Sequence, residues 1–158
     1  MKILVLGLGN PILGDDGVGI TAAALLEERL PPGLPVEVDT DYHGGLHLME
    51  RLVGYDLAII IDAICTGTHP PGTILRLGPD DVPTQHTASA HDVNLPTALA
   101  MARRMRLTIP QEICIIAIEA QNVLQFNEHC TPAVEAALPR AVDAALAQLR
   151  EWTREEGR

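Results

Sequence analysis

Short apolar runs alternate with amphipathic stretches along the chain, and this alternation predicts its secondary structure. Apolar runs that are rich in β-favouring side chains and bounded by glycine or polar residues are typical of buried strands. They predict strands at 2–6, 36–39, 56–62, 74–77 and 112–119. Apolar residues that recur at every third or fourth position predict helices at 16–30, 46–53, about 91–105 and 132–152.

The order of these elements predicts an α/β fold, because strands that alternate with helices form a parallel sheet covered on both faces. The run DLAIIID at 56–62 is apolar on both faces and is therefore expected in the middle of the sheet. The turn-rich stretch 66–73 predicts a strand hairpin leading into 74–77, which makes the sheet mixed. We expect a three-layer sandwich with a central mixed, mainly parallel sheet of about five strands. A single domain spanning 1–158 accounts for the whole chain.

Two prolines bear on the last helix. Thr131 and Pro132 form an N-cap and first-turn pair that begins it. Pro139 lies inside the same pattern and is expected to kink or split the helix, because proline lacks the N–H that continues the hydrogen-bond ladder.

The charge of the chain excludes several partners. Its formal net charge is −10 with 158 residues, which repels nucleic acid and anionic membrane surfaces. No apolar run is long enough to span a bilayer, and the start of the chain does not resemble a signal peptide. Three widely spaced cysteines fit neither a disulfide framework nor a zinc ribbon. We therefore expect a soluble cytoplasmic protein.

The segment 7–19, GLGNPILGDDGVG, carries two adjacent acids at the start of the first helix. A dinucleotide fingerprint would have glycine where Ile12 stands, and the two carboxylates would occupy the place of a pyrophosphate. A nucleotide site is therefore disfavoured. One interpretation is purely structural: Asp15 or Asp16 caps the helix and the other stabilises its first turn.

A second interpretation is a metal site. Asp62 ends the predicted central strand, and Asp16 follows the first strand at the same carboxyl edge of the sheet. His91 stands at the start of a later helix, with His86 as a competitor five residues upstream. Two carboxylates and an imidazole suit a borderline divalent ion such as nickel, zinc, manganese or iron. A basic residue or loop N–H groups can equally partner Asp62, so the residues alone leave both readings open.

The remaining candidates for chemistry are weaker. The other histidines, at 43, 47, 69 and 129, are expected at the surface. Cys114 lies inside a predicted buried strand and serves packing. Cys65 and Cys130 have no activating neighbour apart from His129, and no serine-hydrolase elbow or zincin motif is present.

Taken together, these segments resemble the nickel–iron hydrogenase maturation proteases. The resemblance rests on GLGNPILGDDGVG, DLAIIIDA, SAHDVNL and TPAVEAALPRAVDAAL, and it covers nearly the whole chain. It implies an endopeptidase that removes the C-terminal extension of the hydrogenase large-subunit precursor after nickel insertion. It also implies that Asp16, Asp62 and His91 bind that nickel, which is supplied by the substrate, while another divalent ion can substitute in isolation. The nucleophile is left unassigned, and we expect a monomer.

This sequence departs from the family pattern at one loop. Many relatives carry an Asp-Gly-Gly-Thr-like segment after the second strand, whereas residues 39–45 here read DTDYHGG, so no role is carried over to this loop. Some relatives have Glu at the position of Asp16.

Two other functions compete with this one. A nickel-checkpoint protein or metallochaperone that cuts nothing needs the same three ligands. Peptidyl-tRNA hydrolases also begin with a strand followed by Gly-Leu-Gly-Asn-Pro, but they need a basic surface for tRNA that a chain of charge −10 lacks.

Overall fold

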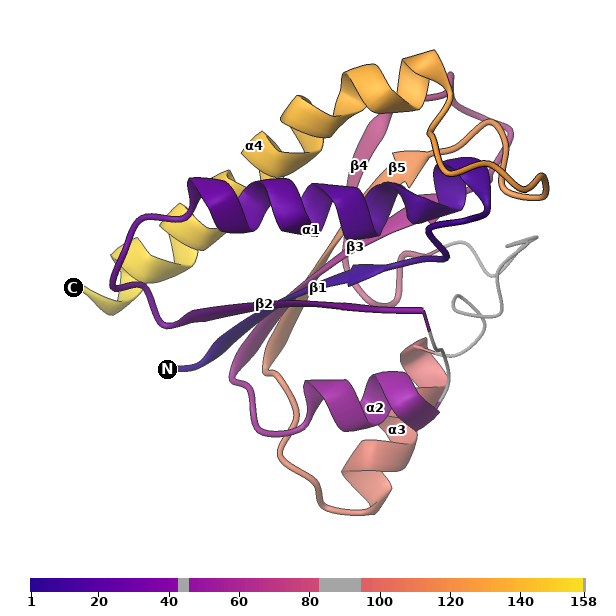
Figure 1. Ribbon diagram of the computed structural model, residues 1–158. Coiled ribbons are helices and arrows are strands. Elements are labelled where there is room, and N and C mark those ends of the chain that lie inside the picture. The colour runs from indigo at the N-terminus through magenta and orange to yellow at the C-terminus, as the bar shows by residue number, and fades with distance from the viewer. Residues whose placement is uncertain (43–45, 83–94, 158) are drawn as a thin grey trace.

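The computed structural model describes residues 1–42, 46–82 and 95–157, which build a three-layer α/β sandwich around one five-stranded sheet (Figure 1). The strands are β1 (Ile3–Leu8), β2 (Val36–Asp41), β3 (Leu57–Ile64), β4 (Ile74–Leu77) and β5 (Glu112–Glu119). The helices are the 3₁₀ turn η1 (Gly14–Gly17), α1 (Val18–Arg29), α2 (Leu46–Leu52), α3 (Leu95–Arg104) and α4 (Pro132–Glu156). The strand order is β2-β1-β3-β5-β4, with β4 alone antiparallel to its neighbour. The predicted fold class is confirmed.

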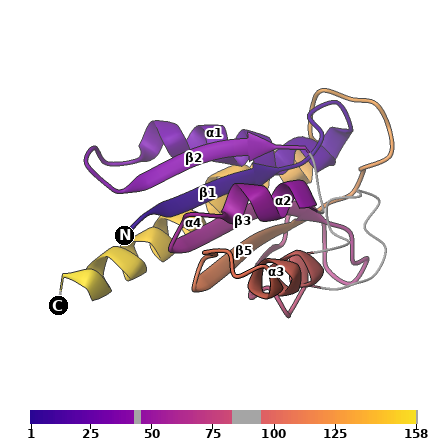
Figure 2. The same ribbon diagram turned by 90° about the horizontal axis from the view of Figure 1, so that it is seen from below.

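Alternating side chains divide the core between the two faces of the sheet. Odd-numbered residues of β1 and β3, such as Val5 and Ile61, pack with α1 and α4, whereas even-numbered ones, such as Leu6 and Ile60, pack with α2 and α3. Figures 1 and 2 show α1 and α4 on one side of the sheet and α2 and α3 on the other. Because both faces are covered, the central strands are apolar on both sides, and the sequence prediction for β3 is confirmed.

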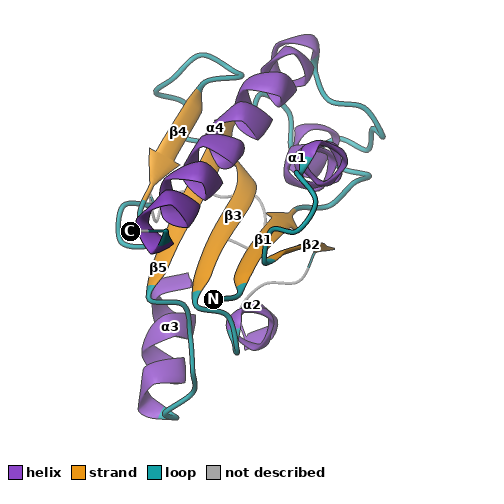
Figure 3. Cartoon of the chain, turned by 90° about the vertical axis from the view of Figure 1, so that its left-hand side faces the viewer, coloured by secondary structure: helices purple, strands orange, loops and turns teal. Residues whose placement is uncertain are grey.

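The position of β4 differs from the prediction. The predicted hairpin placed β4 beside β3, but β4 pairs antiparallel with β5, which lies between them (Figure 3). The connection after β3 passes over the end of β5: the N–H of Gly72 donates to the Glu119 carbonyl at 2.7 Å, and the N–H of Glu119 donates to the Thr73 carbonyl at 2.9 Å. These bonds hold the connection against the end of β5, so β4 lies on the side of β5 that faces away from β3.

Several predicted boundaries also shift. Three strands continue two residues further than predicted, β1 to Leu8, β2 to Asp41 and β3 to Ile64. Of the two predicted effects of Pro139, a kink or a split, the split is wrong, because α4 is one helix from Pro132 to Glu156 with Thr131 as its N-cap residue. Pro139 and Glu135, one turn before it, are both exposed, so water can bond the carbonyl that proline leaves without a partner.

Glycines let α1 approach the sheet at the ends of β1 and β3. A Cβ built on Gly19 would lie 2.3 Å from the carbonyl oxygen of Ile61 and 2.4 Å from that of Leu8. A Cβ on Gly7 would lie 2.4 Å from the Gly19 carbonyl oxygen. The glycines of the 7–19 motif therefore bring helix and sheet into backbone contact. The strand β1 runs through Gly7 instead of ending there, because Gly7 keeps its pairing with Thr40 and Ile61.

This close approach predicts the effect of one added methyl group. In Gly19→Ala the new Cβ collides with two strand carbonyls, which cannot move as a flexible side chain can. We expect the substitution to lower the free energy of unfolding by about 3 kcal/mol and the melting temperature by about 10 °C. Gly157→Ala is the matched control, since the nearest atom to its Cβ would be 3.7 Å away. Equal melting temperatures for the two variants in a calorimetric scan would contradict this packing.

Within the described part of the chain, no helix combines the length and the apolar character that crossing a membrane requires.

Candidate active site

Between the carboxyl ends of β1 and β3, the direction in which the chain adds strands to the sheet reverses, and this position is the switch point of the fold. From β1 the chain passes to β2 on one side, and from β2 it returns to β3 on the other side. In open α/β sheets, loops at such a switch point diverge and leave a crevice for ligands. The pairing of β1 with β3 ends at Gly7 and Ile61, so the two strands part at Asp62.

Asp16 lies at this edge, after the end of β1. It lies in η1, which contacts β3, and its side chain is only 2% exposed. One carboxylate oxygen, Oδ2, accepts the N–H of Asn10 at 2.8 Å. Gly9 has φ +145°, and a Cβ there would lie 1.8 Å from the carbonyl oxygen of Asp16, so only glycine lets the loop fold back this tightly. The loop therefore fixes both the backbone and the carboxylate of Asp16.

Asp62 lies at the same edge, in β3. It was predicted to be the last residue of that strand, but the strand ends at Ile64. The strand continues to Ile64 because Asp62, Ala63 and Ile64 keep their pairing with β5. Asp62 is 6% exposed, and its Oδ1 accepts the N–H of Ala63 at 2.9 Å. The structure thus brings Asp16 and Asp62 to the same edge of the sheet, next to the contact between Gly19 and Ile61.

The third predicted ligand, His91, lies outside the described residues, as do His86 and His43. Among residues 1–42, 46–82 and 95–157, no three His, Cys, Asp or Glu side chains lie close enough together to hold a metal ion. The described helix α3 begins at Leu95, four residues after His91, on the same face of the sheet as Asp62.

Asp15 has a different role from its neighbour, and the helix-capping interpretation is wrong for both acids. Helix α1 begins after Gly17, with no side-chain cap. The carboxylate of Asp15 is fully buried and instead accepts three backbone N–H groups, from Gln121 and Asn122 at 2.9 Å and from Thr131 at 2.6 Å. The Thr131 hydroxyl also donates to it, at 2.9 Å to Oδ2. Asp15 therefore ties η1 to the 120–131 loop and to the start of α4.

Two further buried carboxylates, which were not among the predicted site residues, lie at the same edge. Asp41, at the end of β2, is 7% exposed, and its Oδ2 lies 2.7 Å from Nδ1 of His47 on α2. Glu119, at the end of β5, is 1% exposed and accepts both the N–H of Thr66, at 3.0 Å, and its hydroxyl. Their parity places both on the face shared with Asp62. A polar residue that closes an apolar strand run was the signal available in the sequence.

The thiols with shifted acidity are poor nucleophiles. Burial raises the pKa of Cys130 to about 11, and the negative charges of Asp15 and Glu135 add to the rise. Burial also raises the pKa of Cys114, against the opposing effect of Arg76. Since the thiolate is the reactive form, at neutral pH only about one Cys130 thiol in ten thousand can attack a carbonyl.

The raised pKa of Cys130 can be measured by alkylation. Because the folded state holds the thiol protonated, we expect the rate of its reaction with iodoacetamide to rise about tenfold per pH unit from pH 8 to 10, without levelling off. The urea-unfolded chain is the control, in which the same cysteine should level off near pH 9, its ordinary range. Peptide mass mapping reads the modification at this residue. A folded-state rate that levels off near pH 9 would contradict the assignment.

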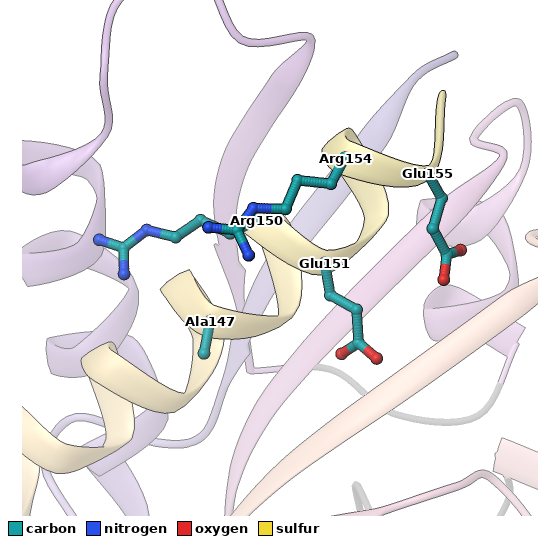
Figure 4. Close-up of a pocket in the computed structure, with 5 residues that line it drawn as sticks. All are labelled: Ala147, Arg150, Glu151, Arg154 and Glu155. Carbon is teal, nitrogen blue, oxygen red and sulfur yellow. The ribbon is translucent and has the colours of Figure 1, made fainter. Parts of the chain in front are cut away.

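A surface depression of about 520 Å³ lies elsewhere, along the end of α4 (Figure 4). The depression is lined by residues that recur every three or four positions on one face of that helix: Ala147, Arg150, Glu151, Arg154 and Glu155. In Figure 4 the two arginines point away from the two glutamates. This end of α4 lies near both chain termini, at the opposite end of the sheet from the carboxyl ends of β1 and β3 (Figure 1), so the depression is no part of the acidic site.

The fold and site define an α/β protein with an acidic site at its switch point, and the comparisons with known proteins specify which one. A family model described as hydrogenase maturation protease matches residues 43–148. Hydrogenase 2 maturation protease of Escherichia coli K12 is 33% identical over 153 residues, which are 96% of this chain and 92% of that protein. HupD of Rhodobacter capsulatus, a hydrogenase expression/formation protein, is 29% identical over 96% of this chain and 72% of its own length.

Solved structures agree with these relatives. The hydrogenase maturating endopeptidase HybD of E. coli superimposes with a TM-score of 0.79 at 31% identity, over 96% of this chain and 93% of that one. HybD of Thermococcus kodakarensis gives a TM-score of 0.68 at 29% identity, over 94% and 99% of the two chains. The chain therefore belongs to the hydrogenase maturation protease family and is an endopeptidase.

Proposed function

We propose that this endopeptidase removes the C-terminal extension of a nickel–iron hydrogenase large-subunit precursor, and does so after nickel has entered the precursor. The observation that supports the proposal is that Asp16 and Asp62 lie at the same edge of the sheet, beside the switch point, in a chain of this family. In the proposal, His91 is the third ligand, and the nickel belongs to the substrate rather than to the protease.

The chemistry of the two carboxylates supports an ion of this kind. Both are nearly buried, and a buried carboxylate is stabilised by a cation or by hydrogen-bond donors. Nickel accepts carboxylate oxygen and imidazole nitrogen together, and it tolerates open positions for other ligands. A precursor that already holds nickel can therefore share its metal with Asp16, Asp62 and His91, and an empty precursor offers them nothing to bind.

Nickel would act here as a recognition tether. It would hold the precursor against the edge of the sheet and so place the scissile bond, since positioning alone lowers a barrier substantially. Because Cys130 and Cys114 keep their protons, neither supplies a thiolate at neutral pH. In the proposal, water is the nucleophile that hydrolyses the peptide bond.

The metal requirement has a direct test. Nickel-loaded and nickel-free forms of the same precursor are each incubated with the protein, and the shortening of the large subunit is followed on a denaturing gel. We expect the nickel-loaded form to be shortened and the nickel-free form to stay intact, with at least about a hundredfold difference in rate. Equal rates for the two forms would refute the nickel-sensing role and leave a protease that reads the precursor in another way.

A further inference from the structure

Three exposed apolar residues lie on two hydrogen-bonded segments beside the turn that carries Asp16. Ile12 is 47% exposed, Leu124 76% and Phe126 82%. We call these three residues the apolar rim. Phe126 is the single phenylalanine of a chain with only 3% aromatic residues. Of the large apolar side chains in the described part of the chain, it is the most exposed. A residue type that usually fills cores has here been placed in solvent.

The rim is built from two segments that are bonded to each other. The N–H of Asn127 donates to the Ile12 carbonyl at 2.9 Å, and the N–H of Gly14 donates to the Asn127 carbonyl at 2.8 Å. The N–H of Asp15 adds a bond of 2.8 Å to the Asn122 carbonyl. Figures 1 and 2 both show the 120–131 loop lying over the η1 turn. The rim is thus joined to the same turn that presents Asp16.

The loop that carries Leu124 and Phe126 has its own internal hydrogen bonds. The Asn122 side-chain oxygen accepts the N–H of Gln125 at 3.2 Å, and the Asn127 side-chain oxygen accepts the N–H of His129 at 2.9 Å. Asp15 holds both ends of the loop through Asn122 and Thr131. A surface that is ordered before binding loses less entropy on binding, so these side chains are suited to dock a partner.

Size and charge decide among the possible occupants. Even an aromatic side chain buries only roughly 150–250 Å², so the three rim residues alone fall short of the roughly 800 Å² per partner that a stable interface with a second copy needs. An anionic membrane is disfavoured by the net charge of −10. A protein substrate can also cover the adjoining edge that carries Asp16 and Asp62, so the rim forms only part of its interface. A second copy placed there would bring another net charge of −10 against those carboxylates.

We propose that the apolar rim docks the large-subunit precursor, through an apolar surface next to its C-terminal extension. The inference rests on the proposed function, since it takes the same substrate, but it adds a contact that does not involve nickel. The rim contributes affinity for the folded precursor, and the acidic edge contributes the recognition of its metal.

Kinetics separate docking from catalysis. The double variant Leu124→Ser with Phe126→Ser removes two side chains that are mostly in solvent, so it should fold normally. We expect its KM for nickel-loaded precursor to rise about tenfold and its kcat to stay within about twofold. Met101→Ser with Met105→Ser is the matched control, because these methionines are 40% and 57% exposed on and after α3, away from the rim. An unchanged KM in the rim variant would overturn the proposal.

A binding measurement keeps this inference distinct from the cleavage function. In the Asp16→Asn background, affinity for nickel-free precursor is measured by calorimetry with and without the rim substitutions. A Kd about tenfold weaker in the rim variant supports docking even if the protein proves to cut nothing. An equal Kd, or no binding at all, overturns docking whatever the cleavage result. A change in oligomeric state by light scattering with no change in Kd assigns the rim to a second copy and likewise overturns it.

Discussion

Asp16→Asn is expected to reduce processing of nickel-loaded precursor by at least about a hundredfold, because a direct ligand should matter at least as much as the outer-shell partners of a metal. Asparagine keeps the shape of the side chain and an oxygen for the N–H of Asn10. The free energy of unfolding should therefore change by no more than about 1 kcal/mol. The rate is measured by gel shift, and the stability by urea denaturation. Loss of folding would instead assign Asp16 a structural role.

Companion variants test whether the carboxylate itself is required. Asp62→Asn should behave like Asp16→Asn, since the two carboxylates lie at the same edge of the sheet, one in η1 and one in β3. Asp16→Glu restores a carboxylate one methylene longer and should recover part of the activity. Nickel affinity measured by calorimetry on the protein alone should fall for both asparagine variants. Full processing by either asparagine variant would remove that residue from the proposed ligand set.

Asp15→Ala is expected to have the largest effect on stability of the substitutions considered, whereas Asp16→Asn, at the neighbouring residue, should change stability little. The substitution leaves the N–H groups of Gln121, Asn122 and Thr131 without their acceptor. Each buried donor left unpaired costs about 1–3 kcal/mol, and more where the lost acceptor is charged. We expect the free energy of unfolding to fall by about 4 kcal/mol or more, which is a large part of the stability of an ordinary domain.

Asp80→Ala is the matched control for this variant, because it removes the same charge from an exposed position. It should change the free energy of unfolding by no more than about 0.5 kcal/mol. Urea denaturation followed by circular dichroism measures both. A loss below about 1 kcal/mol for Asp15→Ala would show that other groups or water satisfy the three donors, and the loop would then not depend on Asp15.

These two neighbouring acids illustrate how far the sequence could predict the site. The motif indicated that both carboxylates stand at the start of α1, and the switch-point rule placed Asp16 and Asp62 at one edge. The partners of Asp15 lie more than a hundred residues away, at Gln121 to Thr131. A local pattern therefore suggested helix capping, which long-range hydrogen bonds replace.

The errors in the predicted fold have the same cause, because contacts between residues far apart in the sequence leave no local pattern. The sequence pattern located the five strands of the described residues. Burial on both faces leaves a clear apolar run in β1, β3 and β5, whereas the edge strands β2 and β4 are only partly buried and left shorter β-favouring runs. The pattern could not show that β4 lies beyond β5, since that depends on the connection bound to Glu119. Nor did it identify Gly7 as part of β1, because its small size serves a contact with Gly19 that exists only in three dimensions. The pairing of Asp41 with His47 was missed for a similar reason: it joins a strand to a helix.

The most direct test of the account is mass spectrometry of the large-subunit precursor after incubation with this protein. Nickel-loaded precursor is treated with the unmodified protein or with Asp16→Asn, and the masses of all products are recorded. The account predicts one C-terminal peptide and one shortened subunit, in equal amounts, with the unmodified protein only. An intact precursor that stays bound to the unmodified protein would contradict the assigned cleavage and indicate a nickel-checkpoint function instead.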